Sequence, residues 1–431
     1  MISMVGIKEV FEKDLDEVSI KGWIYRRREL KEKIFVVLRD KDDIIQCVFS
    51  RENFNDAQWK ELLELQIEGS IEVSGIVRED PRAPKGKEVE VKSYKIFDKG
   101  LKFPIHGREE VRTIMKYRHL WIRSRKFNAI LKVKSTLIDA LREWLLSNEY
   151  VEVNPPIIIP VAVEEVQTLF ELNYFDKKAY LTQSSQLYLE ALIYSLEKVF
   201  CLAPSFRAEK SRTRRHLHEY WHLEIESAWY DLSDIMKDAE EMIKYGISKV
   251  VEKNKKELEF LGRDVKTLED YLNRPFKKIT YEKAIEILKN KGLSINYGDD
   301  LGADEERILT LDFDVPIFVT HYPRKLKAFY MKESGNGKTV ENFDLLANEG
   351  YGEIIGGSQR EDNYEILKNK IIEWNLPLEN YEWYLDLRKY GSVPHSGFGL
   401  GIERMLMWIC KLDHIRDTLP FPRLRESEIL I

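Results

Sequence analysis

The stretch Phe206-Arg-Ala-Glu-Lys-Ser-Arg-Thr-Arg-Arg-His-Leu-His-Glu-Tyr-Trp-His-Leu-Glu-Ile-Glu-Ser-Ala-Trp229 decides the fold of this 431-residue chain. Its second half alternates, so that Trp221, Leu223 and Ile225 fall on one side and His222 falls on the other with two glutamates. A repeat of two residues is typical of a β-strand, because successive side chains of a strand point to opposite faces. This stretch therefore predicts a strand that is part of a sheet.

The first half of the same stretch is basic. Arg207 is predicted to lie in a strand, and the loop after it contains Arg214, Arg215 and His216. A guanidinium group can hold two phosphate oxygens at once. The strand, the basic loop and the returning strand therefore predict a cradle for a polyphosphate, with a solvated charged hairpin as the alternative.

A zinc site is a rival interpretation of this segment. His218-Glu-Tyr-Trp-His222 matches the HExxH pattern of zinc peptidases, in which two histidines bind the metal from one face of a helix. The alternation of the surrounding residues predicts a strand instead, and no clear third ligand follows. We keep a zinc peptidase as a remote alternative.

A glycine-rich segment near the C-terminus, Gly397-Phe-Gly-Leu-Gly-Ile-Glu-Arg404, leads into the apolar run Met405-Leu-Met-Trp-Ile-Cys. Glycines let a backbone approach a ligand closely, and Arg404 is expected at the start of the helix. The spacing is not that of a dinucleotide-binding loop. The alternative is a tight packing joint between a strand and a helix.

The first hundred residues predict a small barrel. Five β-branched and partly alternating segments are expected as strands, at 18–25, 33–38, 44–49, 71–77 and 88–94, with a helix over 54–65 between the third and the fourth. Five strands with a helix in that position are the order of an OB-fold. We therefore expect an OB-fold domain over 1–100 and a polar linker over 101–120.

The remainder, 121–431, is expected to form one larger α+β domain. Apolar residues at helical spacing predict an amphipathic helix over about 123–147, and the extended segment Tyr150-Val-Glu-Val-Asn-Pro-Pro-Ile-Ile-Ile-Pro160 follows it. The stretch at about 233–300 is charged and predicted to be a helical insertion. Strand-like and helical segments alternate in the rest.

Composition limits the class of protein. Hydrophobic residues make up 43% of the chain and the formal net charge is −6, which argues against nonspecific nucleic-acid affinity over the whole surface. No run of 18 apolar residues and no secretory signal are visible, and three distant cysteines do not suggest a disulfide framework. We expect a cytoplasmic protein without membrane contact.

Three of these segments, 150–160, 206–229 and 397–404, together resemble the three signature motifs of class II aminoacyl-tRNA synthetases. They occur in the order of that family, and the preceding barrel is similar to that of the subgroup for aspartate, asparagine and lysine. Further similar strings are Tyr117-Arg-His-Leu-Trp-Ile-Arg123, Glu353-Ile-Ile-Gly-Gly-Ser-Gln-Arg360 and Phe421-Pro-Arg423. The resemblance covers nearly the whole chain and implies an OB barrel followed by a catalytic domain with an antiparallel sheet flanked by helices.

The resemblance also implies roles in binding ATP. Arg207 would bridge the amino-acid carboxylate and the α-phosphate, Glu209 would accept from the adenine amino group, and Tyr220 and Arg404 would enclose the ring. Arg215 and His216 would bind the γ-phosphate. Asp344 and Glu353 would carry Mg²⁺. Arg207 and Arg404 are the residues expected to act in catalysis, by position and charge.

The choice of amino acid depends on a segment predicted as a helix, Gln183-Ser-Ser-Gln-Leu-Tyr-Leu-Glu190. Aspartate enzymes of this subgroup have a lysine at the position of Leu189, where it neutralises the substrate carboxylate. A leucine there favours a neutral carboxamide. Glu224 would accept from the carboxamide nitrogen and Arg360 would donate to its oxygen, which together predict asparagine, as in the archaeal-type asparagine enzymes.

The resemblance implies further contacts and partners. Glu164, Ser184 and Gln186 would hold the α-amino group. In the barrel, Phe35 would stack on an anticodon base and Gln46 would read a base edge, unless Phe35 is buried. Arg26 and Arg28 would contact phosphates, as would Lys21 and Arg27. The expected partners are tRNA(Asn), asparagine and a second copy of the chain, with Pro156 at the dimer interface.

Other functions stay open at this point. The nearest is an aspartate–tRNA ligase, which would also charge the asparagine tRNA if it were non-discriminating. More remote are an asparagine synthetase-like paralogue, which usually lacks the barrel, and a noncatalytic RNA-binding protein.

Overall fold

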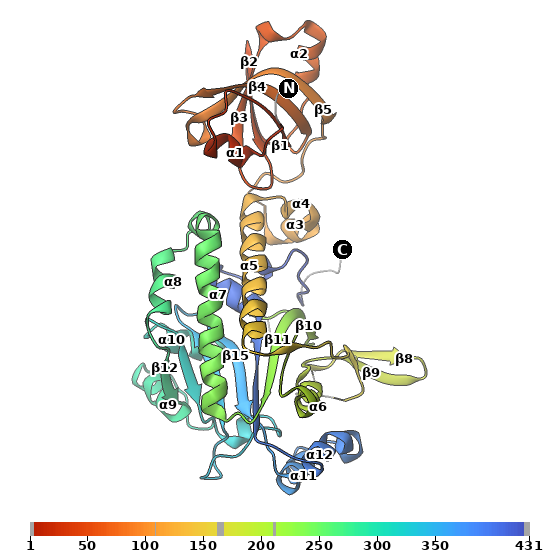
Figure 1. The fold of residues 1–431 in the computed structure, drawn as a ribbon, viewed down its shortest axis with the longest axis vertical. Coiled ribbons are helices and arrows are strands. Elements are labelled where there is room, and N and C mark those ends of the chain that lie inside the picture. The colour runs from red at the N-terminus through yellow and green to blue at the C-terminus, as the bar shows by residue number, and fades with distance from the viewer. Residues whose placement is uncertain (1–3, 108, 162–167, 210–212, 426–431) are drawn as a thin grey trace. The chain divides into compact units, whose positions relative to one another are not determined.

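The structure is a computed structural model that describes residues 4–107, 109–161, 168–209 and 213–425. The chain forms two compact units, residues 1–120 and 121–431 (Figure 1). Within the described ranges, no helix is both long and apolar enough to span a membrane.

The first unit contains the predicted barrel. Its strands are β1 (Glu17–Leu30), β2 (Lys33–Arg39), β3 (Ile44–Ser50), β4 (Ser70–Glu79) and β5 (Lys87–Asp98), and they close in the order β1-β2-β3-β5-β4. Helix α2 (Asp56–Leu63) lies between β3 and β4 in sequence, as predicted, and a short helix α1 (Ile7–Glu12) precedes the barrel. Along β2 the residues Ile34, Val36 and Leu38 are fully buried. Because side chains alternate along a strand, Phe35 lies on the outer face.

The segment predicted as a linker contains two short helices, α3 (Val111–Lys116) and α4 (Arg118–Trp121). The prediction of a plain polar connection was therefore incomplete. Polar composition alone did not reveal these helices, each of which is only one or two turns long.

The second unit is built on an eight-stranded sheet with the order β12-β13-β14-β15-β16-β11-β10-β6. Neighbouring strands are antiparallel from β13 to β10, whereas the β12–β13 and β10–β6 pairs at the two edges are parallel. The predicted antiparallel sheet is thus a mixed sheet with an antiparallel centre. The strands are β6 (Val151–Glu152), β10 (Lys198–Phe206), β11 (Glu219–Ala228), β12 (Lys277–Thr280), β13 (Ile317–Thr320), β14 (Asn342–Ala347), β15 (Gly352–Gln359) and β16 (His395–Gly401).

Helices α5 (Arg125–Ser147), α7 (Leu232–Phe260) and α13 (Ile402–Ile409) share the main hydrophobic core with this sheet, and α5 and α7 run side by side in Figure 1. The Oγ of Ser124 accepts from the backbone N–H of Phe127 at 3.3 Å, which caps α5 at its start. The stretch predicted as an insertion contains α7, α8 (Val265–Leu272), β12 and α9 (Tyr281–Asn290). It therefore contributes to the main core and to the main sheet.

A second group of elements forms a smaller core. It comprises a three-stranded sheet of β7 (Ile158–Ile159), β9 (Lys177–Leu181) and β8 (Glu171–Tyr174), with α6 (Gln186–Leu196), α11 (Tyr364–Glu373) and α12 (Glu382–Lys389). Helix α10 (Ala303–Thr310) belongs to another small core together with α9 and β13. The β8–β9 hairpin projects from this unit in Figure 1.

Candidate active site

Two adjoining hollows lie over the central strands of the sheet. The first, the nucleotide cleft, is lined by Arg207, Glu209, Arg215, His216, Tyr220, His222, Glu353 and Arg404, among others. The second, the amino-acid hollow, is lined by Ser184, Gln186, Leu189, Glu224, Glu226, Lys327, Asp344 and Arg360, among others. Arg207, His222, Glu353 and Gly399 line both, so they mark the junction. The structure therefore brings together residues from two of the three motif regions, 206–229 and 397–404, whereas 150–160 does not line either hollow.

A glycine on β16, Gly399, lines both hollows. Gly399 pairs with Glu224 of the neighbouring strand β11. A Cβ atom at Gly399 would lie only 2.2 Å from Nε2 of His222, so no larger residue fits there while that ring keeps its place. At Gly399 the glycine-rich segment therefore packs closely against a side chain of β11, and Arg404 lies in the first turn of α13, as predicted.

Arg215 in the nucleotide cleft has unused donors. Its Nη2 donates to Oε2 of Glu306 at 2.6 Å, and the same oxygen accepts from the backbone N–H of Glu353 at 2.8 Å. Among the described residues, Nε and Nη1 of Arg215 are buried and have no hydrogen-bond partner. Buried donors without partners cost free energy, so an acceptor added at these atoms would be favourable. Glu306 was not predicted, and no local pattern indicated it.

Arg207, Glu209 and His216 lie close together beside Tyr220. Arg207 follows directly after β10 rather than lying inside it, and its Nη1 is 3.8 Å from Oε1 of Glu209. The Nε2 of His216 is 3.5 Å from the other oxygen of Glu209. Burial and the neighbouring cation Arg404 lower the pKa of His216. The imidazole is therefore neutral near pH 7, where it can donate or accept one hydrogen bond.

Two carboxylates predicted as metal ligands lie on adjacent strands, Asp344 on β14 and Glu353 on β15. Oδ2 of Asp344 is 2.6 Å from Nζ of Lys327, and Oε2 of Glu353 is 2.8 Å from Nη1 of Arg404. Burial raises the pKa of Asp344. Carboxylate oxygens are the ligands that Mg²⁺ prefers, so the donor set fits this ion. Sequence reasoning missed Lys327, which follows a 3₁₀ turn and has no motif around it.

Glu224, on β11, accepts hydrogen bonds from the two residues that precede α6. It accepts a short hydrogen bond from Oγ of Ser184 and another from the backbone N–H of Ser185 at 2.8 Å. The predicted helix 183–190 begins only at Gln186, because the two serines turn toward this carboxylate. Leu189 is fully buried against the hollow.

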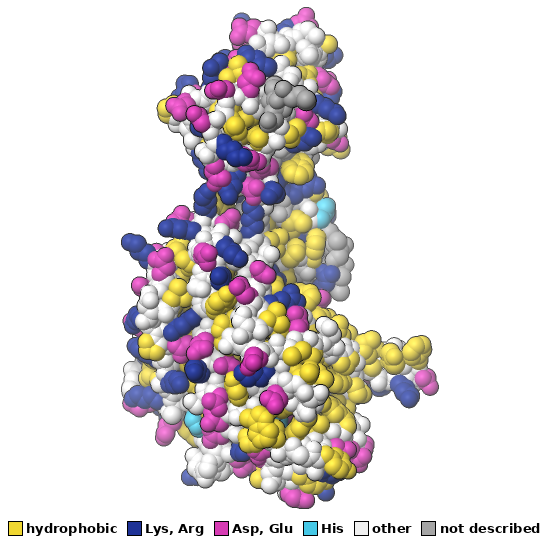
Figure 2. Space-filling model, viewed as in Figure 1, with side chains coloured by type: hydrophobic (Ala, Val, Ile, Leu, Met, Phe, Trp, Pro, Cys, Tyr) yellow, Lys and Arg dark blue, Asp and Glu magenta, His cyan; other side chains and the backbone are white. Residues whose placement is uncertain are grey.

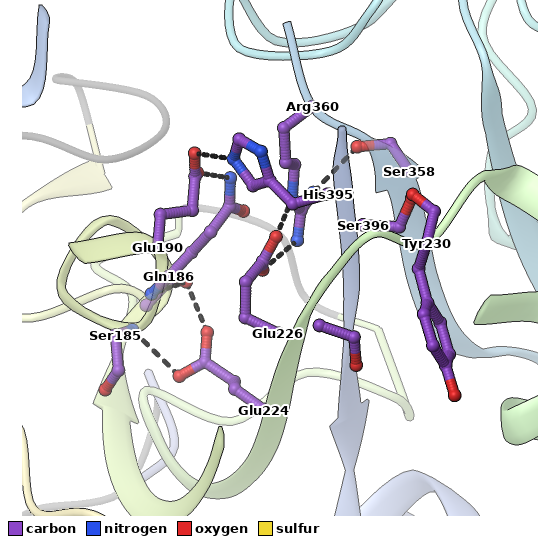
Figure 3. A network of polar contacts seen from close by, with 12 residues as sticks. Ser185, Gln186, Glu190, Glu224, Glu226, Tyr230, Ser358, Arg360, His395 and Ser396 are labelled. Atoms are coloured by element: carbon purple, nitrogen blue, oxygen red, sulfur yellow. Dashed lines mark hydrogen bonds and ion pairs between the residues drawn. The ribbon is translucent and has the colours of Figure 1, made fainter. Parts of the chain in front are cut away.

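A buried polar network lies beside the amino-acid hollow (Figure 3). Arg360 donates from Nε and Nη2 to the two oxygens of Glu226, at 2.9 Å each. Farther in, Glu190 accepts from Nη2 of Arg388 at 2.6 Å and lies 2.8 Å from Nε2 of His395. Burial opposes the charge of Glu190, but Arg388 and His395 hold its pKa below the usual value.

Arg360 was predicted as a site residue, as was Gln186, whose Nε2 donates to Oε1 of Glu190 at 3.0 Å, whereas Glu190, Glu226, Arg388 and His395 were not. Glu190, Glu226 and His395 offer ligand atoms within 4.8 Å of one another, which is close enough for a metal ion. Arg360 and Arg388 already neutralise the two carboxylates, so the arrangement is an ion-pair network.

The zinc interpretation is wrong. His222 lies within β11 and His218 lies just before that strand, so the pair does not share one face of a helix. The Nε2 of His218 is 3.2 Å from the backbone oxygen of Glu209 instead.

The predicted anticodon contacts lie on one outer face of the barrel. Arg28 pairs with Phe35 across β1 and β2, Arg26 pairs with Val37, and Val37 pairs with Gln46 of β3. Directly paired residues of antiparallel strands share a face. The Nε2 of Gln46 donates to Oε2 of Glu88 at 2.7 Å. Arg27 is used structurally, because its Nη2 donates to the backbone oxygen of Leu63 at the end of α2. Glu164, predicted to hold the α-amino group, lies outside the described residues.

Two family models match the chain. The family model described as tRNA synthetases class II (D, K and N) matches residues 110–425, and a model described as an OB-fold nucleic acid binding domain matches residues 18–97. The chain belongs to the class II tRNA synthetases of the D, K and N group.

Individual relatives agree over nearly the whole chain. It is 53% identical over 407 residues to the asparagine–tRNA ligase of Thermococcus gammatolerans, covering 94% of each chain, and 52% identical over 428 residues to that of Pyrococcus furiosus, covering 98% of each. Among solved structures, it resembles the asparaginyl-tRNA synthetase of Pyrococcus horikoshii complexed with asparaginyl-adenylate, with a TM-score of 0.95, 51% identity and coverage of 99% and 100%.

Proposed function

We propose that the chain is an asparagine–tRNA ligase, which activates asparagine with ATP and transfers it to tRNA(Asn). The observation that carries the proposal is the amino-acid hollow, in which Leu189, Glu224 and Arg360 lie together beside the nucleotide cleft. The relatives at 52–53% identity support the same reaction. A zinc peptidase or a noncatalytic module would not need two such adjoining hollows.

Activation is an in-line displacement at the α-phosphorus of ATP. The carboxylate of asparagine attacks, the bond to the β-phosphate oxygen breaks, and pyrophosphate leaves, so no side chain need act as a nucleophile or as a general base. Arg207 lines both hollows, and this position supports its proposed role between the substrate carboxylate and the α-phosphate. The unused donors of Arg215 support the proposed contact with the γ-phosphate.

The adenine is proposed to lie between Tyr220 and Arg404, with its amino group on Glu209. All three line the nucleotide cleft, and the neutral imidazole of His216 completes the phosphate end. Mg²⁺ bound by Asp344 and Glu353 would neutralise charge on the polyphosphate. These residues act by position and charge, which is how phosphoryl-transfer sites commonly lower the barrier.

Discrimination against aspartate follows from the charges around the hollow. Glu226 already neutralises Arg360, and Leu189 brings no charge to the position where a lysine would be needed. The carboxylate of aspartate would therefore be desolvated near Glu224 without a counter-ion, whereas a carboxamide is neutral. We propose that Glu224 accepts from the carboxamide nitrogen and that Arg360 donates to its oxygen. Ser184, Gln186 and Glu164 are proposed to hold the α-amino group.

The barrel is proposed to bind the anticodon and the second unit to carry out the chemistry. The outward position of Phe35 beside Arg28 supports stacking on a base with phosphate contacts nearby.

A homodimer is proposed through the segment around Pro156, where Ile157 and Ile158 are 39% and 44% exposed. Figure 2 shows apolar side chains gathered over the neighbouring β8–β9 hairpin. A cytoplasmic location is part of the same proposal, and the three cysteines are buried and unpaired.

Charging of tRNA with labelled asparagine tests the proposal. The expected result is asparaginyl-tRNA from the wild-type protein and a raised KM for tRNA in Phe35→Ala, with amino-acid activation unchanged. Ile67→Ala is the matched control, because Ile67 is an apolar side chain of the same unit that is 43% exposed and is not among the predicted tRNA contacts. Activation without any charging of tRNA would contradict the proposed transfer step, and an equal effect of both variants would contradict the anticodon face.

A further inference from the structure

Two cations hold the two proposed metal ligands in a symmetric way. Lys327 binds Oδ2 of Asp344 at 2.6 Å and Arg404 binds Oε2 of Glu353 at 2.8 Å. The other oxygens, Oδ1 of Asp344 and Oε1 of Glu353, both lie near Gly356, at 3.7 and 3.3 Å from the position that a Cβ atom would take there. One oxygen of each carboxylate is therefore held by a cation, and the other faces a shared space without a side chain.

The cluster is electrically balanced without a metal ion. Two carboxylates and two cations contribute equal and opposite charges, and the adjacent ion pair of Arg215 with Glu306 at 2.6 Å adds no net charge. The side chain of Lys327 is 16% exposed, and its Nζ lies 3.9 Å from the ring centre of the buried Tyr322. The Nζ atom lies 2.6 Å from a carboxylate oxygen of Asp344, and a contact at this distance with an opposite charge stabilises the ammonium form of Lys327. Arg404 is charged at every accessible pH.

A divalent ion that entered this cluster alone would meet that ammonium group at close range. It would turn a balanced cluster into one with excess positive charge in a partly buried place, where charge interactions are stronger than in water. A nucleoside triphosphate removes this obstacle, because its phosphates bring several negative charges. The ion and the nucleotide therefore fit the cluster together much better than the ion alone.

We propose that Lys327 is a built-in counter-cation, which orients Asp344 and keeps the cluster from binding a divalent ion until the triphosphate arrives. This inference rests on the proposed function and makes Lys327 a positioning residue for the metal. The role of Lys327 thus makes the binding of Mg²⁺ dependent on ATP.

The test is a titration with Mn²⁺, a spectroscopic substitute for Mg²⁺, followed by electron paramagnetic resonance on the full chain without ATP, amino acid or tRNA. The wild-type protein is expected to bind Mn²⁺ weakly. Lys327→Met, which keeps most of the side-chain volume but removes the charge, is expected to bind at least about tenfold more tightly, because one close repulsion is gone. Lys327→Gln is the second neutral variant, and a melting curve shows which of the two is folded.

Two controls isolate the charge of Lys327. Lys327→Arg keeps the charge and should bind Mn²⁺ as weakly as the wild type. Lys332→Met removes a lysine that pairs with Asp362 at 2.8 Å and does not line the amino-acid hollow, so it should also have no effect.

The proposal is overturned if the ATP-free wild-type protein already has a tight Mn²⁺ site, or if a folded neutral variant binds Mn²⁺ no better than the wild type. Failure of the proposed function gives a different result, because then the wild-type protein would catalyse no asparagine-dependent exchange of pyrophosphate with ATP. The metal titration does not depend on that activity.

Discussion

Both carboxylate oxygens of Glu226 accept hydrogen bonds from Arg360, one from Nε and one from Nη2, at 2.9 Å each, and both side chains are buried. The pair fixes the plane of the guanidinium group at the edge of the amino-acid hollow. It also cancels the positive charge of Arg360. The same contact thus explains both how Arg360 is oriented and why it does not favour a substrate carboxylate.

Glu226→Gln should weaken asparagine binding and reduce discrimination. The loss of a charge-assisted contact costs about 1.5–3 kcal/mol, so we expect kcat/KM for asparagine to fall by about ten- to a hundredfold, with the KM for ATP unchanged. Because Arg360 is then uncompensated, relative activity with aspartate should rise. Glu349→Gln is the matched control, since Glu349 forms a similar two-point contact with Arg263 that does not line the hollow. Equal decreases of kcat/KM for asparagine in both variants would show that Glu226 only stabilises the fold.

Leu189→Lys should shift the enzyme toward aspartate. The substitution places a cation in the hollow where a substrate carboxylate lacks a counter-ion. We expect the ratio of kcat/KM for aspartate to that for asparagine to rise by at least about tenfold, because one favourable charge contact is worth 1.4 kcal/mol or more. Leu189→Met, which stays apolar, should keep the wild-type ratio. An unchanged ratio in a folded Leu189→Lys variant would show that selectivity arises elsewhere.

Arg215→Met should raise the KM for ATP. The variant loses donors that have no partner among the described residues, on a side chain that lines the nucleotide cleft. We expect about a tenfold or larger increase in the KM for ATP and little change in the KM for asparagine. The double variant with Glu306→Gln limits the loss of stability that an unpaired Glu306 would cause. Arg214→Met is the neighbouring control, and an equal change in its KM for ATP would argue against a specific role of Arg215.

The acid sensitivity of the protein should depend on Glu353. Partial burial raises the pKa of this carboxyl, but Arg404, Lys327 and Arg215 outweigh it and lower the pKa to about 2, against 4.5 when unperturbed. The folded state therefore binds fewer protons, and this contribution to stability is complete above pH 4.5 and is lost as the pH falls toward 2.

The measurement is the free energy of unfolding in urea at pH 5 and at pH 3. The wild type should lose about 1–2 kcal/mol more than Glu353→Gln over this interval, a value reduced because the side chain is one-third exposed. Equal losses in the two proteins would show that the ion pair with Arg404 does not stabilise the fold.

Local patterns predicted the elements on which the site is built. The alternation of apolar and polar residues from Trp221 to Ile225 was sufficient to choose a strand over the helix of a zinc peptidase, because this alternation is a local property of the sequence. The same alternation predicted that either Phe35 or its neighbours Ile34 and Val36 face the core. Ile34 and Val36 are fully buried, so Phe35 lies on the outer face.

Long-range pairs could not be predicted in this way. His395 and Arg388 contact Glu190 across separations of 205 and 198 residues. Lys327 meets Asp344 only because a 3₁₀ turn places it beside β14. The periodicity of apolar residues in the sequence does not predict such contacts, since they depend on how distant elements pack. For the same reason the start of α6 was misplaced, because Glu224 on β11 draws the preceding serines out of the helix.

The most direct test of the central claim is amino-acid-dependent exchange of pyrophosphate with ATP, with asparagine and aspartate compared side by side at equal concentrations. The hollow formed by Leu189, Glu224 and Arg360 predicts exchange with asparagine and at least a hundredfold lower kcat/KM, on the order of 3 kcal/mol, with aspartate. Exchange with aspartate that equals or exceeds exchange with asparagine would contradict this account of the hollow.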